Sequence, residues 1–174
     1  WYVPQNVEGL FQVINNSGRN VIARLDRMFD EGLYWHGNEP CHQIAYLYNK
    51  AGAPWKTQQR IHHILNTEYN DTPGGLSGND DAGQMSAWYM FSAIGFYPVC
   101  PATPYYYIGT PSFDKVTFNL ENGRKFEIVA EGVDDENFYI QQVDLNGKSG
   151  YYLSHDDLLK GGKLSFRMGN TPKY

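Results

Sequence analysis

The apolar residues of the first hundred positions recur with the spacing of helices. Between Arg19 and Phe29 they lie three or four positions apart, which places them on one face of a helix. Ser17-Gly18 precedes this segment and Gly32 follows it, and both are typical helix boundary signals. The pattern therefore predicts an amphipathic helix over 19–29.

Three further helices are predicted in the same half. One opens at Pro40, a residue tolerated in a first helical turn, and ends at Gly52. The next starts near Pro54. The last covers Gln84–Ile94 and is apolar nearly all round, so we expect it to be buried on all sides. The segment 66–83 has no periodicity and many glycines, prolines and carboxylates, which is typical of a functional loop.

After Pro98 the pattern changes to short runs, several of which alternate between apolar and polar residues. In Val116–Leu120 every second residue is apolar, as in a strand with one buried face. Asn122-Gly123 is a strong hairpin signal, and Asn146-Gly147 repeats it. The predicted strands are 105–108, 115–120, 125–129, 138–143 and 163–166. The fold class is therefore α + β, with a helical domain over 1–98 and an antiparallel β unit over 99–174.

Composition narrows the class of protein. The chain has 174 residues, a net charge of −5, 41% hydrophobic and 19% charged residues. Such a chain is too apolar and too weakly charged to be disordered. No apolar run approaches the length of a membrane span, and the scattered Lys and Arg residues argue against nucleic-acid binding.

The cysteine count and the first residue add two points. Two cysteines, Cys41 and Cys100, are too few for a disulfide scaffold or a cysteine zinc site. The sequence does not decide whether they form one disulfide bridge or stay as two free thiols. The chain begins with Trp1 and carries no signal-peptide pattern, so we expect it to be part of a longer protein.

Aromatic residues are abundant, with 14 Tyr, 9 Phe and 4 Trp, 16% of the chain. Tyr and Trp combine an apolar face with a polar tip, which suits carbohydrate surfaces. Core packing alone explains most of them, and only the excess points to a ligand.

A first polar cluster occupies residues 34–43. It brings two His, a Glu, an Asn, a Gln and a Trp together just before the predicted helix at Pro40. With Pro40 as the first helical residue, Glu39 is the N-cap, and His42 and Gln43 lie in the first turn. Helix capping is the alternative interpretation, although Glu caps less well than Asn or Asp.

A second polar cluster, residues 78–88, ends the long loop with adjacent carboxylates. Asp80 and Asp81 come directly before the apolar helix at Gln84. The N-terminus of a helix favours the ionised form of a carboxylate, so this pair suits a general base or a cation ligand. The alternative is an Asp cap with a solvated neighbour. The spacing fits neither an EF-hand nor a zinc-protease helix.

These residues resemble the C-terminal part of the family-92 glycoside hydrolases, which are exo-acting α-mannosidases. The order and spacing of the motifs match over most of residues 1–125. The motifs are Gly37-Asn38-Glu39-Pro40, Tyr46-Leu47-Tyr48, Pro54-Trp55-Lys56-Thr57-Gln58, the 78–88 segment and Gly95-Phe96-Tyr97-Pro98.

The resemblance implies an N-terminal β-sandwich joined to an (α/α)6 barrel. Residues 1–98 would be the last helices of that barrel, and 99–174 a small antiparallel β unit. The implied reaction is hydrolysis of terminal α-linked mannose with inversion, aided by Ca²⁺. The implied partners are mannose-containing glycans and the upstream part of the same polypeptide, in a secreted, periplasmic or cell-surface protein.

The resemblance also implies roles for single residues. Asp81 matches the general base, with Asp80 in support. The implied sugar-binding residues are His36, Asn38, Glu39 and Trp88; the implied metal ligands are Glu39, Gln43 and Asp81, with His42 nearby. Asn79 stands where the family often has Asp, so a base role there is lost. The general acid would lie upstream of Trp1, which would leave this chain inactive alone.

Inverting hydrolysis requires two carboxyl groups with a water between them, the base ionised and the acid protonated. An ionised Asp81 fits the first role. Two other interpretations stay open: a non-catalytic carbohydrate-binding module that uses Asn38, Glu39 and Asp81, and a purely structural fragment.

Overall fold

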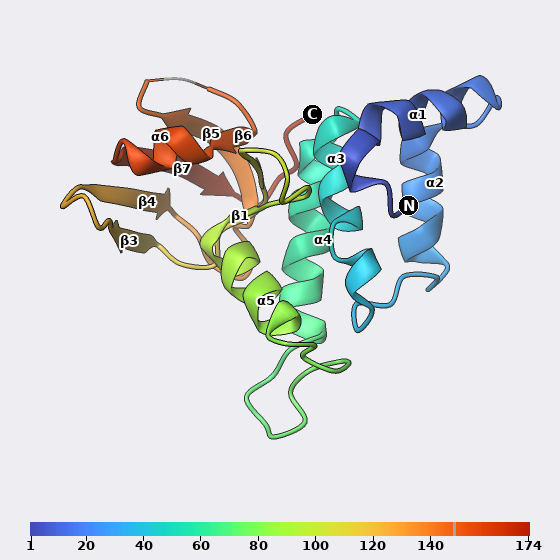
Figure 1. Cartoon of the computed structure of the whole chain (residues 1–174), viewed down its shortest axis with the longest axis horizontal. Helices are drawn as coiled ribbons and strands as arrows, with labels where there is room; N and C mark the ends of the chain where they lie inside the picture. The colour runs from blue at the N-terminus through green and yellow to red at the C-terminus, as the bar shows by residue number, and fades with distance from the viewer. Residues whose placement is uncertain (148) are drawn as a thin grey trace.

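The computed structural model describes residues 1–147 and 149–174. A helical region comes first along the chain, and two small sheets pack beside it (Figure 1). The helices are α1 (Val7–Asn16), α2 (Val21–Asp30), α3 (Leu47–Lys50), α4 (Pro54–Thr67), α5 (Gln84–Ile94) and α6 (His155–Leu159), with 3-10 turns at Pro4–Asn6, Glu39–Cys41 and Ile44–Tyr46.

Local signals set several of these boundaries. The side chain of Asn6 accepts a hydrogen bond from the backbone N–H of Gly9 at the start of α1, and Asn20 does the same for α2. The predicted helix over 19–29 is thus confirmed with a shift to Val21–Asp30. The helix starting at Pro54 and the helix Gln84–Ile94 are confirmed as predicted.

The predicted continuous helix from Pro40 to Gly52 is wrong. Two 3-10 turns occupy its first half, and α-helix is present only over Leu47–Lys50. Residues 42–49 are buried throughout, so packing on every side sets the backbone here rather than one apolar face. Asn38, not Glu39, takes the N-cap position, and its side chain makes no capping bond.

The strands form a three-stranded sheet of order β1-β2-β6 and a four-stranded sheet of order β3-β4-β7-β5. Their bounds are β1 (Phe96–Tyr97), β2 (Tyr105–Ile108), β3 (Lys115–Asn119), β4 (Lys125–Glu131), β5 (Tyr139–Leu145), β6 (Tyr152–Ser154) and β7 (Gly162–Gly169). All five predicted strands are present, and β1 and β6 are additional. β1 pairs with β2, so strand structure begins shortly before residue 99.

The β unit is not wholly antiparallel. Four pairings are antiparallel, but β4 and β7 run parallel; β7, the last strand, lies between β4 and β5. Asn122-Gly123 closes the predicted β3–β4 hairpin. Asn146-Gly147 forms a turn after β5, yet no hairpin follows, since β5 pairs with β7.

Two hydrophobic clusters hold the molecule together. One lies among the helices around Tyr46, Tyr48 and Trp88; the other lies in the β unit around Phe126 and Leu164. Buried hydrogen bonds join the two regions. The amide of Gln58 on α4 accepts from the backbone N–H of Ile140 at 2.9 Å, and Asn49 donates to the carbonyl of Ile108 at 2.7 Å.

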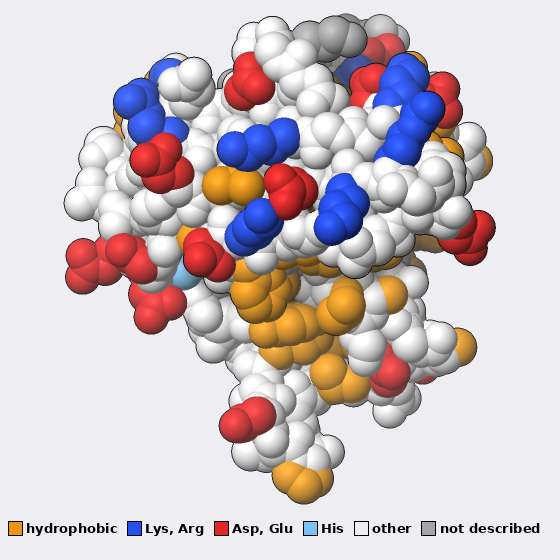
Figure 2. Space-filling model, turned by 90° about the vertical axis from the view of Figure 1, so that its left-hand side faces the viewer, with side chains coloured by type: hydrophobic (Ala, Val, Ile, Leu, Met, Phe, Trp, Pro, Cys, Tyr) orange, Lys and Arg blue, Asp and Glu red, His pale blue; other side chains and the backbone are white. Residues whose placement is uncertain are grey.

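The expectation that α5 is buried on all sides is wrong for this chain. Met85 and Trp88 are fully buried, but Met90 is 60% exposed and Tyr89 38%. Figure 2 shows hydrophobic side chains gathered over this helix, below the charged face of the sheet. The outer side of α5 is therefore an uncovered apolar surface.

Two sequence-level questions are settled by the fold. Cys41 and Cys100 are both free thiols. Of the helices that the structure describes, none has the length and apolar character needed to cross a membrane.

Candidate active site

The two polar clusters of the sequence meet at a contact between two glycines. A Cβ built on Gly78 would lie 2.6 Å from the carbonyl oxygen of Gly37, and one on Gly37 would lie 2.7 Å from that of Ser77. Side chains do not fit at such distances, so the two backbones approach closely because both residues are glycine. The segment that carries Glu39 and the segment that carries Asp80 and Asp81 therefore lie side by side.

The two carboxylates of the second cluster have different tasks. Asp80 Oδ1 accepts hydrogen bonds from the backbone N–H and the hydroxyl of Ser86, at 2.9 and 3.0 Å. Asp80 thus satisfies one backbone N–H of the first turn of α5, although the N-cap residue is Gly83 and not an Asp. Asp81 is exposed, and the hydrogen bonds to Ser86 are made by Asp80 and not by Asp81.

The backbone at Asp81 is held in an uncommon conformation. Asp81 has φ 47°, Ala82 has φ 58° and Gly83 has φ 95°, so three successive residues are left-handed. Asp tolerates this region better than most residues, whereas Ala does not. Such strain persists where the surrounding structure imposes it, and it is concentrated at functional sites.

His36 is fully buried in a network of aromatic side chains. Its Nδ1 lies 2.7 Å from the hydroxyl of Tyr34, its Nε2 lies 2.6 Å from that of Tyr69, and its ring meets Trp88 edge-on at 4.2 Å. Burial, and to a smaller degree the neighbouring His42, lowers the pKa of His36 to about 3, so the ring is neutral. Trp88 is also fully buried. Both rings lie beneath the surface of this chain, and their role in sugar binding stays a prediction.

His42 ties the first cluster to α5. Its Nε2 donates to the carbonyl of His36 at 2.9 Å, and its Nδ1 lies 3.1 Å from the amide nitrogen of Gln84. The indole of Trp88 donates to the His42 carbonyl at 2.9 Å. Burial lowers the pKa of His42 as well, which favours the neutral ring that this pattern of bonds requires. The start of α5 and the segment from His36 to Gln43 therefore form one rigid unit.

Glu39 and Gln43 line a common pocket of about 360 Å³. Gln84 also lines this pocket. Its amide nitrogen hydrogen-bonds to His42 Nδ1 and to the Tyr97 hydroxyl, so its amide oxygen can accept from another partner. The amide nitrogen of Gln43 is buried without a hydrogen-bond partner. A buried N–H donor is normally paired with an acceptor, so a ligand or a water is expected to supply one here.

The pocket includes residues that the sequence analysis did not name as site residues. The polar and aromatic ones among them are Gln84, Tyr97, Phe91 and Tyr2. Gln84 and Tyr97 belong to the motifs that carry the resemblance, so the motifs themselves were the available signal.

Of the predicted site residues, Glu39 and Gln43 line this pocket, and five do not: Asp80, Asp81, His36, Asn38 and Trp88. Asn38 is exposed, and its amide lies 3.7 Å from the sulfur of Cys41. Trp35 was not named, yet it is 58% exposed, and its ring lies 2.7 Å from where a Gly37 Cβ would be. An aromatic face is thus present next to the glycine contact.

The donor atoms in the pocket are those of a hard cation. Glu39 supplies a carboxylate, and Gln43 and Gln84 supply amides, all of which can offer oxygen to Ca²⁺. Within residues 1–147 and 149–174, no three His, Cys, Asp or Glu residues are grouped to hold a metal. One carboxylate and two amides are fewer than the about six to eight oxygen ligands that Ca²⁺ takes, so a calcium ion here would need ligands from outside this pocket.

Comparison with known proteins gives a consistent result. Residues 1–170 match the catalytic domain of glycosyl hydrolase family 92. The family GH92 alpha-mannosidase BT3965 from Bacteroides thetaiotaomicron is 46% identical, with a TM-score of 0.91 over 100% of this chain and 24% of that one. The family GH92 inverting mannosidase BT2199 from the same species is 38% identical, with a TM-score of 0.90 over 99% of this chain and 27% of that one.

A curated relative extends the match to a fungus. A protein of Arthroderma benhamiae, described as an uncharacterized secreted glycosidase, is 32% identical over 97% of this chain and 22% of its own length. The chain thus spans about a quarter of the length of the proteins it matches. On this evidence of sequence and fold, the chain belongs to glycosyl hydrolase family 92.

Proposed function

We propose that this chain forms part of the catalytic domain of a calcium-dependent exo-α-mannosidase, which removes terminal α-linked mannose from glycans with inversion. The observation that carries the proposal is the Gly37–Gly78 contact, since it brings the Glu39 segment and the Asp81 segment together. The names of the two bacterial neighbours, a mannosidase and an inverting mannosidase, support the substrate and the stereochemistry.

Asp81 is the proposed general base. Its carboxylate is free of the capping task, which Asp80 performs, and it lies next to the positive end of α5. That position favours the ionised form, which can take a proton from the attacking water. Asp80 supports it by fixing the turn that holds Asp81.

The remaining predicted residues would bind the sugar or hold those that do. Asn38 and Glu39 would donate to or accept from sugar hydroxyls at the surface. His36 and Trp88 are buried and would contribute indirectly, because their hydrogen bonds with His42 hold the segment that carries Glu39 in place. The exposed ring of Trp35 adds an apolar face beside them.

The metal proposal rests on oxygen donors. Glu39 and Gln43 would hold Ca²⁺, with Asp81 as a further ligand. When bound, the cation supplies positive charge that orients hydroxyl groups of the sugar.

The architecture and location of the whole protein are also proposals. Residues 1–98 would be the last helices of an (α/α)6 barrel, which the exposed apolar side of α5 supports, because that side would face other helices. We further propose that the protein acts outside the cytoplasm, as the name of the fungal relative says of that protein.

The decisive experiment replaces Asp81 in a polypeptide of family length that contains this chain. Asp81→Ala should lower the hydrolysis of p-nitrophenyl α-mannoside by roughly 10²–10⁴-fold, the usual weight of a general base. Asp71→Ala is the matched control, since Asp71 is an exposed carboxylate of the same loop and should change little. Retained activity in Asp81→Ala would reject the base assignment.

Three further measurements test the finer points. Removal of calcium with EDTA should abolish activity, and proton NMR should show the β-anomer of mannose as first product. The 174-residue chain alone should hydrolyse nothing, since the general acid is expected elsewhere. Mannoside binding without hydrolysis by the longer polypeptide would favour the carbohydrate-binding module instead.

A further inference from the structure

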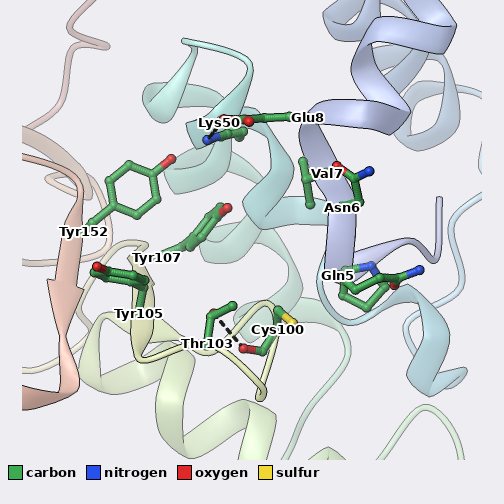
Figure 3. Close-up of a pocket in the computed structure, with 11 residues that line it drawn as sticks. Gln5, Asn6, Val7, Glu8, Lys50, Cys100, Thr103, Tyr105, Tyr107 and Tyr152 are labelled. Carbon is green, nitrogen blue, oxygen red and sulfur yellow. Dashed lines mark hydrogen bonds and ion pairs between the residues drawn. The ribbon is translucent and has the colours of Figure 1, made fainter.

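A second pocket, of about 520 Å³, lies between the start of the chain and the three-stranded sheet. Figure 3 shows tyrosines on one side and the Pro4–Asn6 turn with the start of α1 on the other. Lys50 and Glu8 close one end, and the turn from Cys100 to Thr103 closes the other. The volume is within the range of small-molecule sites, about 300–1,000 Å³.

The strand pattern explains why tyrosines gather there. Tyr105 and Tyr107 are two positions apart on β2, so both side chains point to the same face, while Tyr106 points into the core of the β unit. Tyr152 on β6 pairs directly with Tyr107, and the two rings meet edge-on at 4.7 Å. The sheet therefore presents three neighbouring aromatic rings to the pocket.

Two of these rings are far more open than core residues. Tyr105 is 52% exposed and Tyr152 is 41% exposed, whereas Tyr107 is half-buried. Burial raises the pKa of Tyr107 to about 12, so its hydroxyl stays protonated and can donate. Open aromatic faces with phenolic hydroxyls at their edges suit a ligand that is apolar on its faces and polar around its rim.

The charge of the pocket excludes other ligand classes. Among the residues that the structure describes, Lys50 and Glu8 are the charged ones that line it, and their side chains form an ion pair at 2.5 Å. The two charges cancel, so the pocket offers no net attraction to an anion or a cation. Gln5, Asn6 and Thr103 add polar groups, which a purely apolar ligand would leave unpaired.

We propose that this pocket, which we call the tyrosine pocket (Tyr105, Tyr107 and Tyr152 with the Lys50–Glu8 pair), binds a neutral pyranose unit of a glycan. It is separate from the pocket of Glu39 and Gln43, and only Pro4 lines both. The proposal rests on the proposed function only for the choice of a mannoside as probe. Its role is to hold the glycan, and no bond is made or broken there.

The test is a titration with methyl α-mannoside, followed by saturation-transfer NMR and by the proton–nitrogen spectrum, in the protein that contains this chain. Backbone signals of Tyr105, Tyr107 and Tyr152 should shift on binding. Tyr105→Ala and Tyr152→Ala should each weaken this binding by roughly tenfold, the weight of one good aromatic contact. Tyr174→Ala is the control, because Tyr174 is 92% exposed and does not line the pocket.

Control ligands test whether the pocket prefers a sugar, and the Asp81→Ala variant separates this pocket from the candidate active site. Inorganic phosphate and cyclohexanol should leave the tyrosine signals unchanged, and displacement of the mannoside by either would overturn the proposal. Equal affinity in wild type and both alanine variants would also overturn it. Asp81→Ala should leave the tyrosine pocket intact, so a failure of the hydrolysis proposal would be seen separately, as unchanged turnover in that variant.

Discussion

The helical region and the β unit are stabilised in different ways. In the β unit, strand alternation sends Phe126, Ile128 and Leu164 into a core that Phe91 and Ile94 of α5 also cover. In the helical region, buried rings are joined by hydrogen bonds, as around His36, and the apolar outer side of α5 stays uncovered. The core of the β unit is thus formed by alternating strand residues with help from α5, whereas the helical region uses buried polar groups to hold its loops in place.

The largest effect should come from emptying the core of the β unit. Phe126→Ala removes a fully buried ring and should lower the free energy of unfolding by about 3–5 kcal/mol. Phe113→Ala, at a 49% exposed position, is the control and should cost far less. Urea unfolding measures both. A small loss for Phe126→Ala would contradict the view that the β unit depends on this core.

The glycine contact in the helical region should affect activity more than stability. Gly78→Ala places a Cβ 2.6 Å from the Gly37 carbonyl oxygen, which must push the Glu39 and Asp81 segments apart. A displacement of this size should lower kcat/KM for an α-mannoside by roughly a hundredfold. Gly74→Ala is the matched control, because nothing lies within 4 Å of its Cβ. Equal activity in both variants would mean that the contact does not position the site.

The contacts that Gln58 makes with the β unit can be removed while the Asn49–Ile108 hydrogen bond is kept. Gln58→Leu leaves the buried backbone N–H of Ile140 without its acceptor, which should cost about 1–3 kcal/mol. Gln59→Leu, at the exposed neighbouring position, is the control. If the two regions depend on each other, hydrogen exchange should rise in both after the Gln58 change. A rise in the β unit alone would show that they are independent.

The last prediction is a dependence of stability on pH, which changes gradually per pH unit. The pKa of His36 is about 3 when folded and about 6.5 when unfolded, so the unfolded chain binds the extra proton between these values. Stability is therefore fully present above pH 6.5 and falls by up to about 1.4 kcal/mol per pH unit as the pH drops toward 3. Urea unfolding at pH 7, 6 and 5 measures the slope. His36→Gln should reduce the slope, to which His42 and His62 also contribute because burial lowers their pKa values too. The exposed His63→Gln should leave the slope unchanged.

The sequence predicted the periodic parts of the fold well. Gln84–Ile94 and the β3–β4 hairpin follow from apolar spacing and an Asn-Gly turn, both of which are local signals. The parallel β4–β7 pairing and the 3-10 turns after Glu39 depend on packing between distant segments, and no local pattern encodes them.

The sequence identified two polar clusters, and the fold brings them side by side at Gly37 and Gly78. The roles of their residues stay predictions. The different roles of Asp80 and Asp81 become visible only in the hydrogen bonds between Asp80 and Ser86. The contribution of Gln84 becomes visible only in the fold, which turns its amide toward His42. Both are consequences of tertiary structure, so sequence alone leaves them open.

The approach of Gly37 to Gly78 has a consequence for protein engineering. Two loops that touch backbone to backbone cannot be diversified independently, because any added carbon on one displaces the other. Mutant libraries aimed at a new sugar specificity should hold this pair constant and vary the exposed neighbours Trp35 and Asn38, where added bulk points to solvent.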